Sequence, residues 1–279
     1  MVSPARHLGG ADPDRSEDQD VPRTVVCYKW VTAEGDLRVD PVTREVDTSR
    51  ARSKVSDYDR NTIEAARIAA GQLGGELVGL TFGGPGAKGS VKDVLSRGVD
   101  RAVHVVADEG VRADGHVTAR VLAAQIGALA DVGLVLCTEG ASDTYAHETG
   151  PRLGQVLGWP VVTNVRELRV EDGRVHAVRD LGAEAETVEC DLPAVVTVVS
   201  EVEPAPIPGL KAIMAGGRKP SEQVAVGDLG LPADALTART RVTSFLGYVA
   251  ERRHVRIDEG EPAERVAVLV AGLSQDGVL

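Results

Sequence analysis

Short apolar runs alternate with stretches of helical periodicity through the first 160 residues of this chain. Parallel strands need long crossover connections, so this alternation is typical of an α/β fold with a doubly wound, mainly parallel sheet. From residue 161 the apolar residues recur with period two, which predicts an antiparallel extension of that sheet. The expected strands cover residues 23–31, 76–82, 102–106 and 132–137 of the parallel core and 161–170, 174–181 and 187–199 of the extension, and the expected helices cover residues 57–73, 90–97, 114–129 and 262–273.

The segments outside this pattern differ from it in composition. Residues 1–22 are polar and mostly acidic, and we expect a disordered tail that takes no part in the fold. A short hairpin is expected over residues 37–46. After residue 200 the chain becomes rich in proline and glycine. We therefore divide the chain into an α/β domain over 23–200, a loop over 201–220 and a C-terminal arm over 221–279.

Composition excludes several classes of function. A net charge of -11 and an aromatic content of 3% argue against nucleic acid as a partner, which requires clustered cations and stacking platforms. We find neither an apolar run long enough for membrane insertion nor an export signal, so the expected location is the cytoplasm. Cys27, Cys137 and Cys190 each lie in an apolar strand pattern and are expected to be buried, without forming a disulfide or metal framework. No histidine pair or nucleophile motif predicts a metal site or a catalytic residue.

The segment Val132–Pro160 carries the clearest binding signal. An apolar strand runs into a loop of small residues, Gly140, Ala141 and Ser142, and the next helix begins near His147. Small side chains let backbone N–H groups approach a ligand, and a helix N-terminus favours negative charge. The pattern is typical of phosphate binding, although an ordinary strand–loop–helix connection has the same sequence features.

A second glycine-rich segment competes with this one. Gly84–Gly89 matches G-x-G-x-x-G between a strand and a helix, with Asp108 and Glu109 about 20 residues further on, the layout of a dinucleotide site. Pro85 removes one N–H group from the loop that has to hold a pyrophosphate, and the helix that follows is short. An NAD-linked enzyme therefore stays an alternative.

Taken together, these segments resemble the beta subunit of electron transfer flavoproteins, in particular its Fix-type branch. The stretch from Ala177 to Thr197, with Arg179, Glu186 and the sequence Leu-Pro-Ala-Val-Val-Thr at its end, is similar to the family signature. Pro206–Pro220 is similar to the loop with which the family recognises dehydrogenases, followed by its basic segment. Weaker likeness covers nearly everything after residue 22.

The resemblance implies a nucleotide site on this chain. It places the nucleotide at the ends of the first two strands, in the loop before the first long helix, and in a large loop over residues 140–149. The residues concerned are Cys27, Ser56, Asp57, Tyr58, Asp59, Phe82, Gly140, Ala141, Ser142, Asp143, Thr144, Tyr145, His147 and Thr149. Most family members carry a run of aspartates in this loop, which is absent here, so the implied ligand is AMP or a second FAD.

The resemblance also implies partners. An alpha subunit would hold most of the redox FAD and receive the C-terminal arm, forming a heterodimer. A flavin dehydrogenase would dock on Leu210, Lys211, Ile213 and Met214, and electrons would pass to a quinone reductase or a similar acceptor. The chain itself would carry electrons without catalysis of its own. A stand-alone adenine-nucleotide-binding regulator resembling universal stress proteins is the other alternative.

Overall fold

The computed structural model describes residues 21–108, 111–249 and 253–279. They form two units that we treat separately. The main unit comprises the chain up to Leu37 and Thr48–Thr243, and the small unit comprises Arg38–Asp47 and Ser244–Leu279. All but the last two residues of the tail expected over 1–22 lie outside the described part.

The main unit is built on a nine-stranded sheet with the strand order β11-β10-β9-β12-β8-β1-β6-β7-β13. The strands are β1 (Arg23–Cys27), β6 (Leu77–Gly83), β7 (Arg101–Val106), β8 (Val132–Thr138), β9 (Val161–Glu171), β10 (Arg174–Asp180), β11 (Ala185–Asp191), β12 (Ala194–Val198) and β13 (Ser221–Ala225). Pairing is parallel from β9 through β12 to β13, and β9, β10 and β11 are antiparallel. The predicted α/β fold with a mainly parallel sheet and an antiparallel extension is confirmed.

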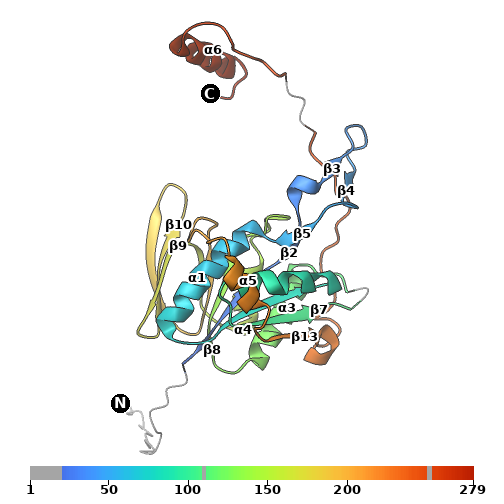
Figure 1. The fold of residues 1–279 in the computed structure, drawn as a ribbon, viewed down its shortest axis with the longest axis vertical. Coiled ribbons are helices and arrows are strands. Elements are labelled where there is room, and N and C mark those ends of the chain that lie inside the picture. Colours follow the sequence, from blue (N-terminus) through green and yellow to red (C-terminus); the bar gives the residue numbers. More distant parts are fainter. Residues whose placement is uncertain (1–20, 109–110, 250–252) are drawn as a thin grey trace, which may run out of the picture. The chain divides into compact units, whose positions relative to one another are not determined.

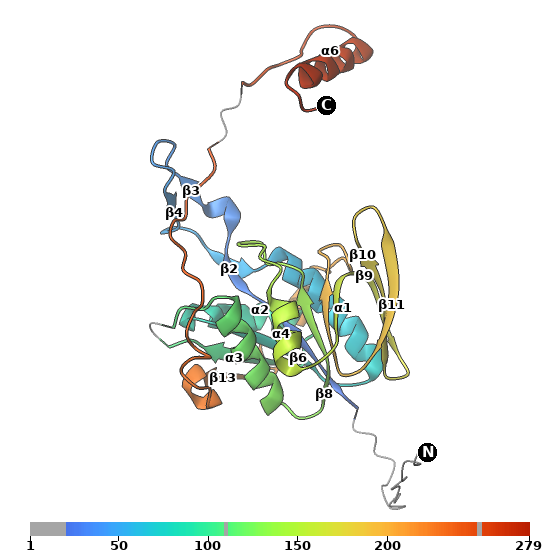
Figure 2. The same ribbon diagram turned by 180° about the vertical axis from the view of Figure 1, so that it is seen from behind.

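Helices cover both faces of this sheet (Figure 1). Helices α1 (Asp57–Leu73) and α2 (Val91–Ser96) bury apolar side chains in the core on one face. On the other face, best seen in Figure 2, α3 (Gly115–Ala128) and α4 (Thr149–Leu157) pack over the second core. The strand order reverses between β1 and β8, because β1 continues to β6 on one side while β8 lies on the other.

Two expected strands are in fact interrupted. The run predicted over 23–31 divides into β1 and β2 (Trp30–Thr32), and β2 pairs with β5 (Ser53–Val55) outside the main sheet. The run predicted over 187–199 divides at Pro193, whose ring removes the N–H group that a ladder needs. Its second half, β12, is not part of the antiparallel extension: it pairs in parallel with β8 and β9 and is buried throughout.

Two elements were missed because their side chains are mostly exposed. Strand β13 has no buried residue, and α5 (Leu210–Gly216) buries only Gly216. The docking segment, expected to be irregular, is therefore helical from Leu210. A Cβ on Gly216 would lie 2.7 Å from the backbone N of Ser96, so this glycine lets α5 pack directly on α2.

In the small unit, β3 (Arg38–Val39) and β4 (Val46–Asp47) form the expected hairpin. The C-terminal helix α6 (Pro262–Gln275) begins with a capping box between Glu261 and Glu264, and none of its residues is buried. Across the described ranges, no helix combines the length and the apolar character needed to cross a membrane.

Close packing of α4 on the sheet predicts the effect of a single added methyl group. A Cβ on Gly150 would lie 2.1 Å from Cγ2 of Thr197 on β12. We expect Gly150→Ala to lower the free energy of unfolding by about 1–3 kcal/mol, measured by urea denaturation, because overpacking forces the helix away from the sheet. Gly71→Ala is the control: a Cβ there meets nothing within 4 Å, so this variant should gain about 1 kcal/mol from helix propensity. Equal stability of the two variants would contradict this packing.

Candidate functional site

A cavity of about 720 Å³ opens in the main unit at the carboxyl ends of β1, β6 and β8. Cys27, Phe82 and Cys137 line it from the three strands. This is the position where the strand order reverses, and ligands of open α/β sheets bind in the crevice at such a point. The cavity therefore lies where both the physical argument and the resemblance expected a ligand.

The loop between β8 and α4 forms one wall of the cavity. Tyr145 and His147 take left-handed backbone conformations with φ of 44° and 54°, which non-glycine residues seldom adopt. Their rings lie edge to face with centroids 4.2 Å apart, and the Tyr145 hydroxyl donates to Oε1 of Glu139 at 2.7 Å. A Cβ on Gly140 would lie 2.7 Å from Cδ2 of Tyr145. A side chain at position 140 would clash with the ring of Tyr145, so the loop can adopt this conformation only with glycine there.

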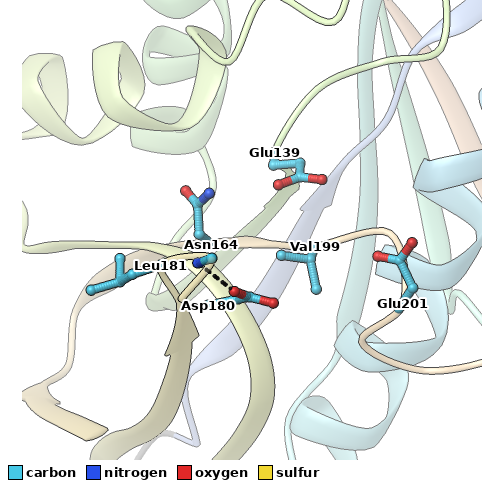
Figure 3. Close-up of a pocket in the computed structure, with 7 residues that line it drawn as sticks. Glu139, Asn164, Asp180, Leu181, Val199 and Glu201 are labelled. Atoms are coloured by element: carbon cyan, nitrogen blue, oxygen red, sulfur yellow. Dashed lines mark hydrogen bonds between the residues drawn. The ribbon is translucent and has the colours of Figure 1, made fainter. Parts of the chain in front are cut away.

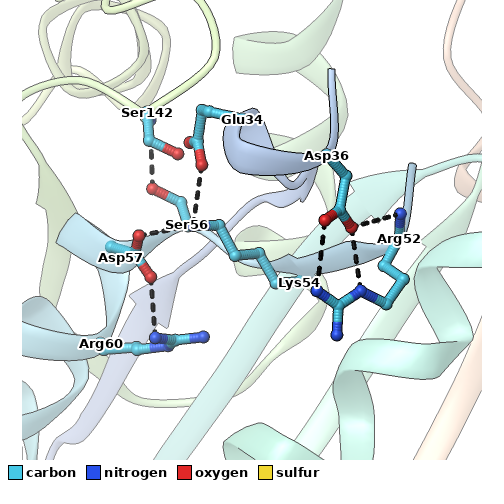
Figure 4. Close-up of polar contacts among 8 residues, drawn as sticks. All are labelled: Glu34, Asp36, Arg52, Lys54, Ser56, Asp57, Arg60 and Ser142. Atoms are coloured by element: carbon cyan, nitrogen blue, oxygen red, sulfur yellow. Dashed lines mark hydrogen bonds and ion pairs between the residues drawn. The ribbon is translucent and has the colours of Figure 1, made fainter. Parts of the chain in front are cut away.

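The start of α1 holds this loop from the opposite side. The hydroxyl of Ser56 accepts a hydrogen bond from the backbone N of Ser142 at 3.2 Å. Lys29, which lines the cavity, pairs with Asp143 through Nζ and Oδ2 at 2.8 Å. Figure 4 shows the neighbouring network, in which Asp57 pairs with two cations: its Oδ2 lies 2.5 Å from Nζ of Lys54, and its Oδ1 lies 2.7 Å from Nη1 of Arg60. The hydrogen bond of Ser56 and the ion pair of Lys29 fix the shape of the loop.

Asp59 brings a carboxyl group to the inner end of the cavity. Its side chain is 1% exposed, and Oδ2 accepts a hydrogen bond from the backbone N of Lys29 at 2.8 Å. Desolvation by burial raises the pKa of Asp59 to about 7, although the hydrogen bond from Lys29 opposes the shift. Asp59 therefore keeps its proton to a higher pH than an exposed carboxyl group does.

Two segments that sequence reasoning missed complete the cavity. One is the start of α3, from Arg112 to Thr118, and the other is an extended strap, Ala238–Val242. Asp114 joins them, because its Oδ2 accepts hydrogen bonds from the backbone N of Arg239 at 2.7 Å and of Thr240 at 2.9 Å. Asp114 also caps α3, because its Oδ1 accepts a hydrogen bond from the backbone N of Val117 at 3.0 Å.

The cavity lining carries charges of both signs. Glu139 is hydrogen-bonded to Tyr145, and Glu148 is paired with Arg152 at 2.9 Å. Arg112 and Arg241 also line the cavity, and neither has an ion-pair partner among the residues placed by the structure. These two cations and the N–H groups at the start of α4 are the groups of the lining that can bind a phosphate.

The predicted nucleotide residues fall into two groups. Those that line the cavity are Cys27, Asp59, Phe82, Gly140, Ala141, Thr144, His147 and Thr149. Those that lie beside it, without forming its wall, are Ser56, Asp57, Tyr58, Ser142, Asp143 and Tyr145. The hydroxyl of Tyr145 is hydrogen-bonded to Glu139, and its ring lies edge to face with the rings of His147 and, at 5.7 Å, Tyr58. The ring of Tyr145 therefore packs against its neighbours and does not face the cavity lining.

The competing glycine motif does not form the site. Residues Pro85–Ser90 make a 3₁₀ helix, and no residue of Gly84–Gly89 lines the cavity. Gly89 instead provides space for Trp30, whose Cζ2 would lie 3.0 Å from an added Cβ. The geometry therefore gives no support to an NAD site here.

The predicted docking residues lie together on α5, away from the cavity lining. The side chains of Leu210, Ile213 and Met214 are 74%, 52% and 58% exposed, and Lys211 is exposed as well. Three exposed apolar side chains on one short helix form a surface on which another protein can pack.

A second, more open hollow of about 490 Å³, drawn in Figure 3, shares Glu139 with the first. Glu139, Asp180 and Glu201 reach it from three different segments, together with Asn164 and Val199. In the described ranges, no group of three or more histidine, cysteine or carboxylate side chains is arranged to hold a metal ion.

Comparison with protein families identifies a domain in this chain. Residues 43–229 match the model of the electron transfer flavoprotein domain. The matched range contains the large loop, the start of α3, α5 and β13, and it ends just before the strap.

The raised pKa of Asp59 predicts how stability depends on pH. Between about pH 4 and pH 7 the folded chain keeps a proton that the unfolded chain has lost, so the free energy of unfolding falls as pH rises through this window, by at most about 4 kcal/mol. Asp59→Asn keeps an acceptor for Lys29 and should remove this fall, so the variant should be the more stable protein at about pH 8. Thermal unfolding at several pH values measures it. Asp57→Asn, on the same helical turn, is the control, and its stability should depend on pH as that of the native chain does. If the stability of Asp59→Asn varies with pH in parallel with that of the native chain, the raised pKa of Asp59 is refuted.

Proposed function

Since that match covers more than half of the chain, the chain belongs to the electron transfer flavoprotein family, and we propose that it is the beta subunit of a heterodimeric member of the Fix-type branch. Proteins of this family bind flavin. In this proposal the redox FAD is shared with an alpha subunit that holds most of it, and a bound flavin supplies one- and two-electron transfer. The chain has no catalysis of its own: it binds a nucleotide, covers the flavin and docks the electron donor.

The cavity is the observation that carries this proposal. Its volume of about 720 Å³ falls within the range of roughly 300–1,000 Å³ typical of cofactor sites. We propose that AMP or a second FAD occupies it. Gly140 and Ala141 allow backbone N–H groups close to a phosphate, and Arg112 and Arg241 supply charge. Phe82 and Leu122 give the cavity the apolar wall that a base requires.

Exposed apolar surface supports a role as one subunit of an assembly. None of the α6 residues is buried, although Val266, Leu269 and Val270 are apolar. We propose that this helix and the C-terminal arm pack on the alpha subunit, and that α5 receives a flavin dehydrogenase. Electrons then leave to a quinone reductase or a similar acceptor. A stand-alone nucleotide-binding regulator would leave the apolar side chains of α5 and α6 exposed to solvent, whereas a subunit of an assembly can bury them against a partner.

Copurification and extraction test the proposal. Coexpressed with an alpha-type subunit, the chain should yield a yellow heterodimer, and acid extraction followed by chromatography should release AMP, or FAD beyond one equivalent. Arg241→Ala should weaken nucleotide binding roughly ten- to a hundred-fold, since a charge-assisted hydrogen bond contributes about 1.5–3 kcal/mol, and should leave the heterodimer intact. Arg218→Ala, exposed after α5, is the control and should bind normally. Release of NAD, or a stable lone chain that transfers electrons, would refute the assignment.

Docking on α5 gives a separate prediction. If Leu210 fills a pocket on the dehydrogenase, Leu210→Ala should cost on the order of 2 kcal/mol, roughly a 30-fold weaker interaction, because one anchor often dominates an interface. Flavin content and thermal stability should not change, because the side chain is 74% exposed. Electron transfer from the cognate dehydrogenase is measured against heterodimer concentration. Val156→Ala, half-exposed on α4 across the sheet, is the control; an unchanged apparent affinity for Leu210→Ala would contradict docking at this helix.

A further inference from the structure

Two cysteines meet at the point where the strand order reverses. Cys27 is the last residue of β1, and Cys137 is the residue before the end of β8. The two strands pair in parallel with Val26 opposite Leu136, so Cys27 and Cys137 continue the same register one step further. Both belong to the apolar core between the sheet and the helices α3 and α4, which places the two side chains on one face.

Their geometry suits a covalent bond. Neighbouring strands lie about 4.8 Å apart, within the Cα separation of roughly 4.4–6.8 Å that disulfides span. The two side chains lie close enough to influence each other's ionisation, and both cysteines are free. Cys190, on β11, belongs to the core on the other face and is only half-buried.

Access to the pair is through the nucleotide cavity. Cys27 and Cys137 are 6% and 2% exposed, and both line the cavity. A small molecule that enters the cavity can therefore reach the sulfur atoms, and a larger ligand that fills it would cover them.

We propose that Cys27 and Cys137 form an oxidisable dithiol at the floor of the cavity, which a small peroxide converts to a disulfide. One sulfur attacks the peroxide, the O–O bond breaks, and a sulfenic acid and one water are formed. The second sulfur then attacks the sulfenic sulfur, the S–S bond forms, and a second water leaves. The two thiols lose two electrons and two protons, and hydrogen peroxide is reduced to two molecules of water.

The surroundings of the pair set its reactivity. The neighbouring Cys137 and burial raise the pKa of Cys27 well above its ordinary value. The thiolate is the reactive form, so the pair is slow to oxidise and survives as thiols under reducing conditions. Protection of the pair by a bound nucleotide rests on the proposed function, whereas formation of the disulfide does not.

Peptide mapping of the full-length chain tests the proposal. The reduced protein is treated with hydrogen peroxide over a time course, the remaining thiols are blocked with N-ethylmaleimide, and the peptides are identified by mass spectrometry. We expect a peptide that joins Cys27 to Cys137, with Cys190 blocked, and the same product from the control variant Cys190→Ser. Single-cysteine oxidation products, or Cys27 and Cys137 both blocked by maleimide after exhaustive treatment, would overturn the proposal.

Adding AMP separates the dithiol from the nucleotide assignment. Saturating AMP should slow formation of the disulfide at least ten-fold, because the ligand covers the floor of the cavity. A disulfide that forms equally fast with AMP would support the dithiol and count against the nucleotide site. Absence of the disulfide with and without AMP would overturn the dithiol alone.

Discussion

The pairing of β1 with β6 on one side and β8 on the other is the constraint on which the site depends. After β1 the chain crosses one face of the sheet through α1, and before β8 it crosses the other through α3. Because the two connections diverge, no helix covers the carboxyl ends of these strands, and a crevice is left. Most of the cavity wall comes from segments that leave or enter the sheet at this edge, and the strap Ala238–Val242 completes it.

The parallel core could be predicted from the sequence because its strands are buried on both faces and are therefore continuously apolar. Apolar character failed as a signal at Pro193, which separates β11 from β12. The two strands follow each other and were predicted as one, although β11 is mostly exposed and antiparallel, whereas β12 is buried and parallel. The same signal failed again at β13, whose side chains are mostly exposed, and at α5, where Leu210, Ile213 and Met214 recur at helical spacing but lie in a segment that was interpreted as a loop. Backbone pairing with β7 and the contact of Gly216 with α2 hold these elements instead.

The site shows a similar limit. Gly140 could be identified from the strand and the small-residue loop around it, and Phe82 from the family resemblance; both line the cavity at the carboxyl end of a strand. The strap was missed because Asp114 binds the backbone of Arg239, 125 positions along the chain, and no local pattern reports such a contact. The resemblance placed Tyr145 at the nucleotide, whereas its hydroxyl bonds Glu139 and its ring holds the loop in shape. Several residues of the predicted site thus support its walls.

Hydrogen exchange of the full chain with and without AMP tests the central claim most directly, because it reports where a nucleotide binds without relying on any substitution. The account predicts slower exchange of backbone amides in the large loop, at the start of α3 and in the strap Ala238–Val242, where hydrogen bonds of the cavity wall become protected. Protection confined to Gly84–Gly89, or to the face around α5, would contradict it.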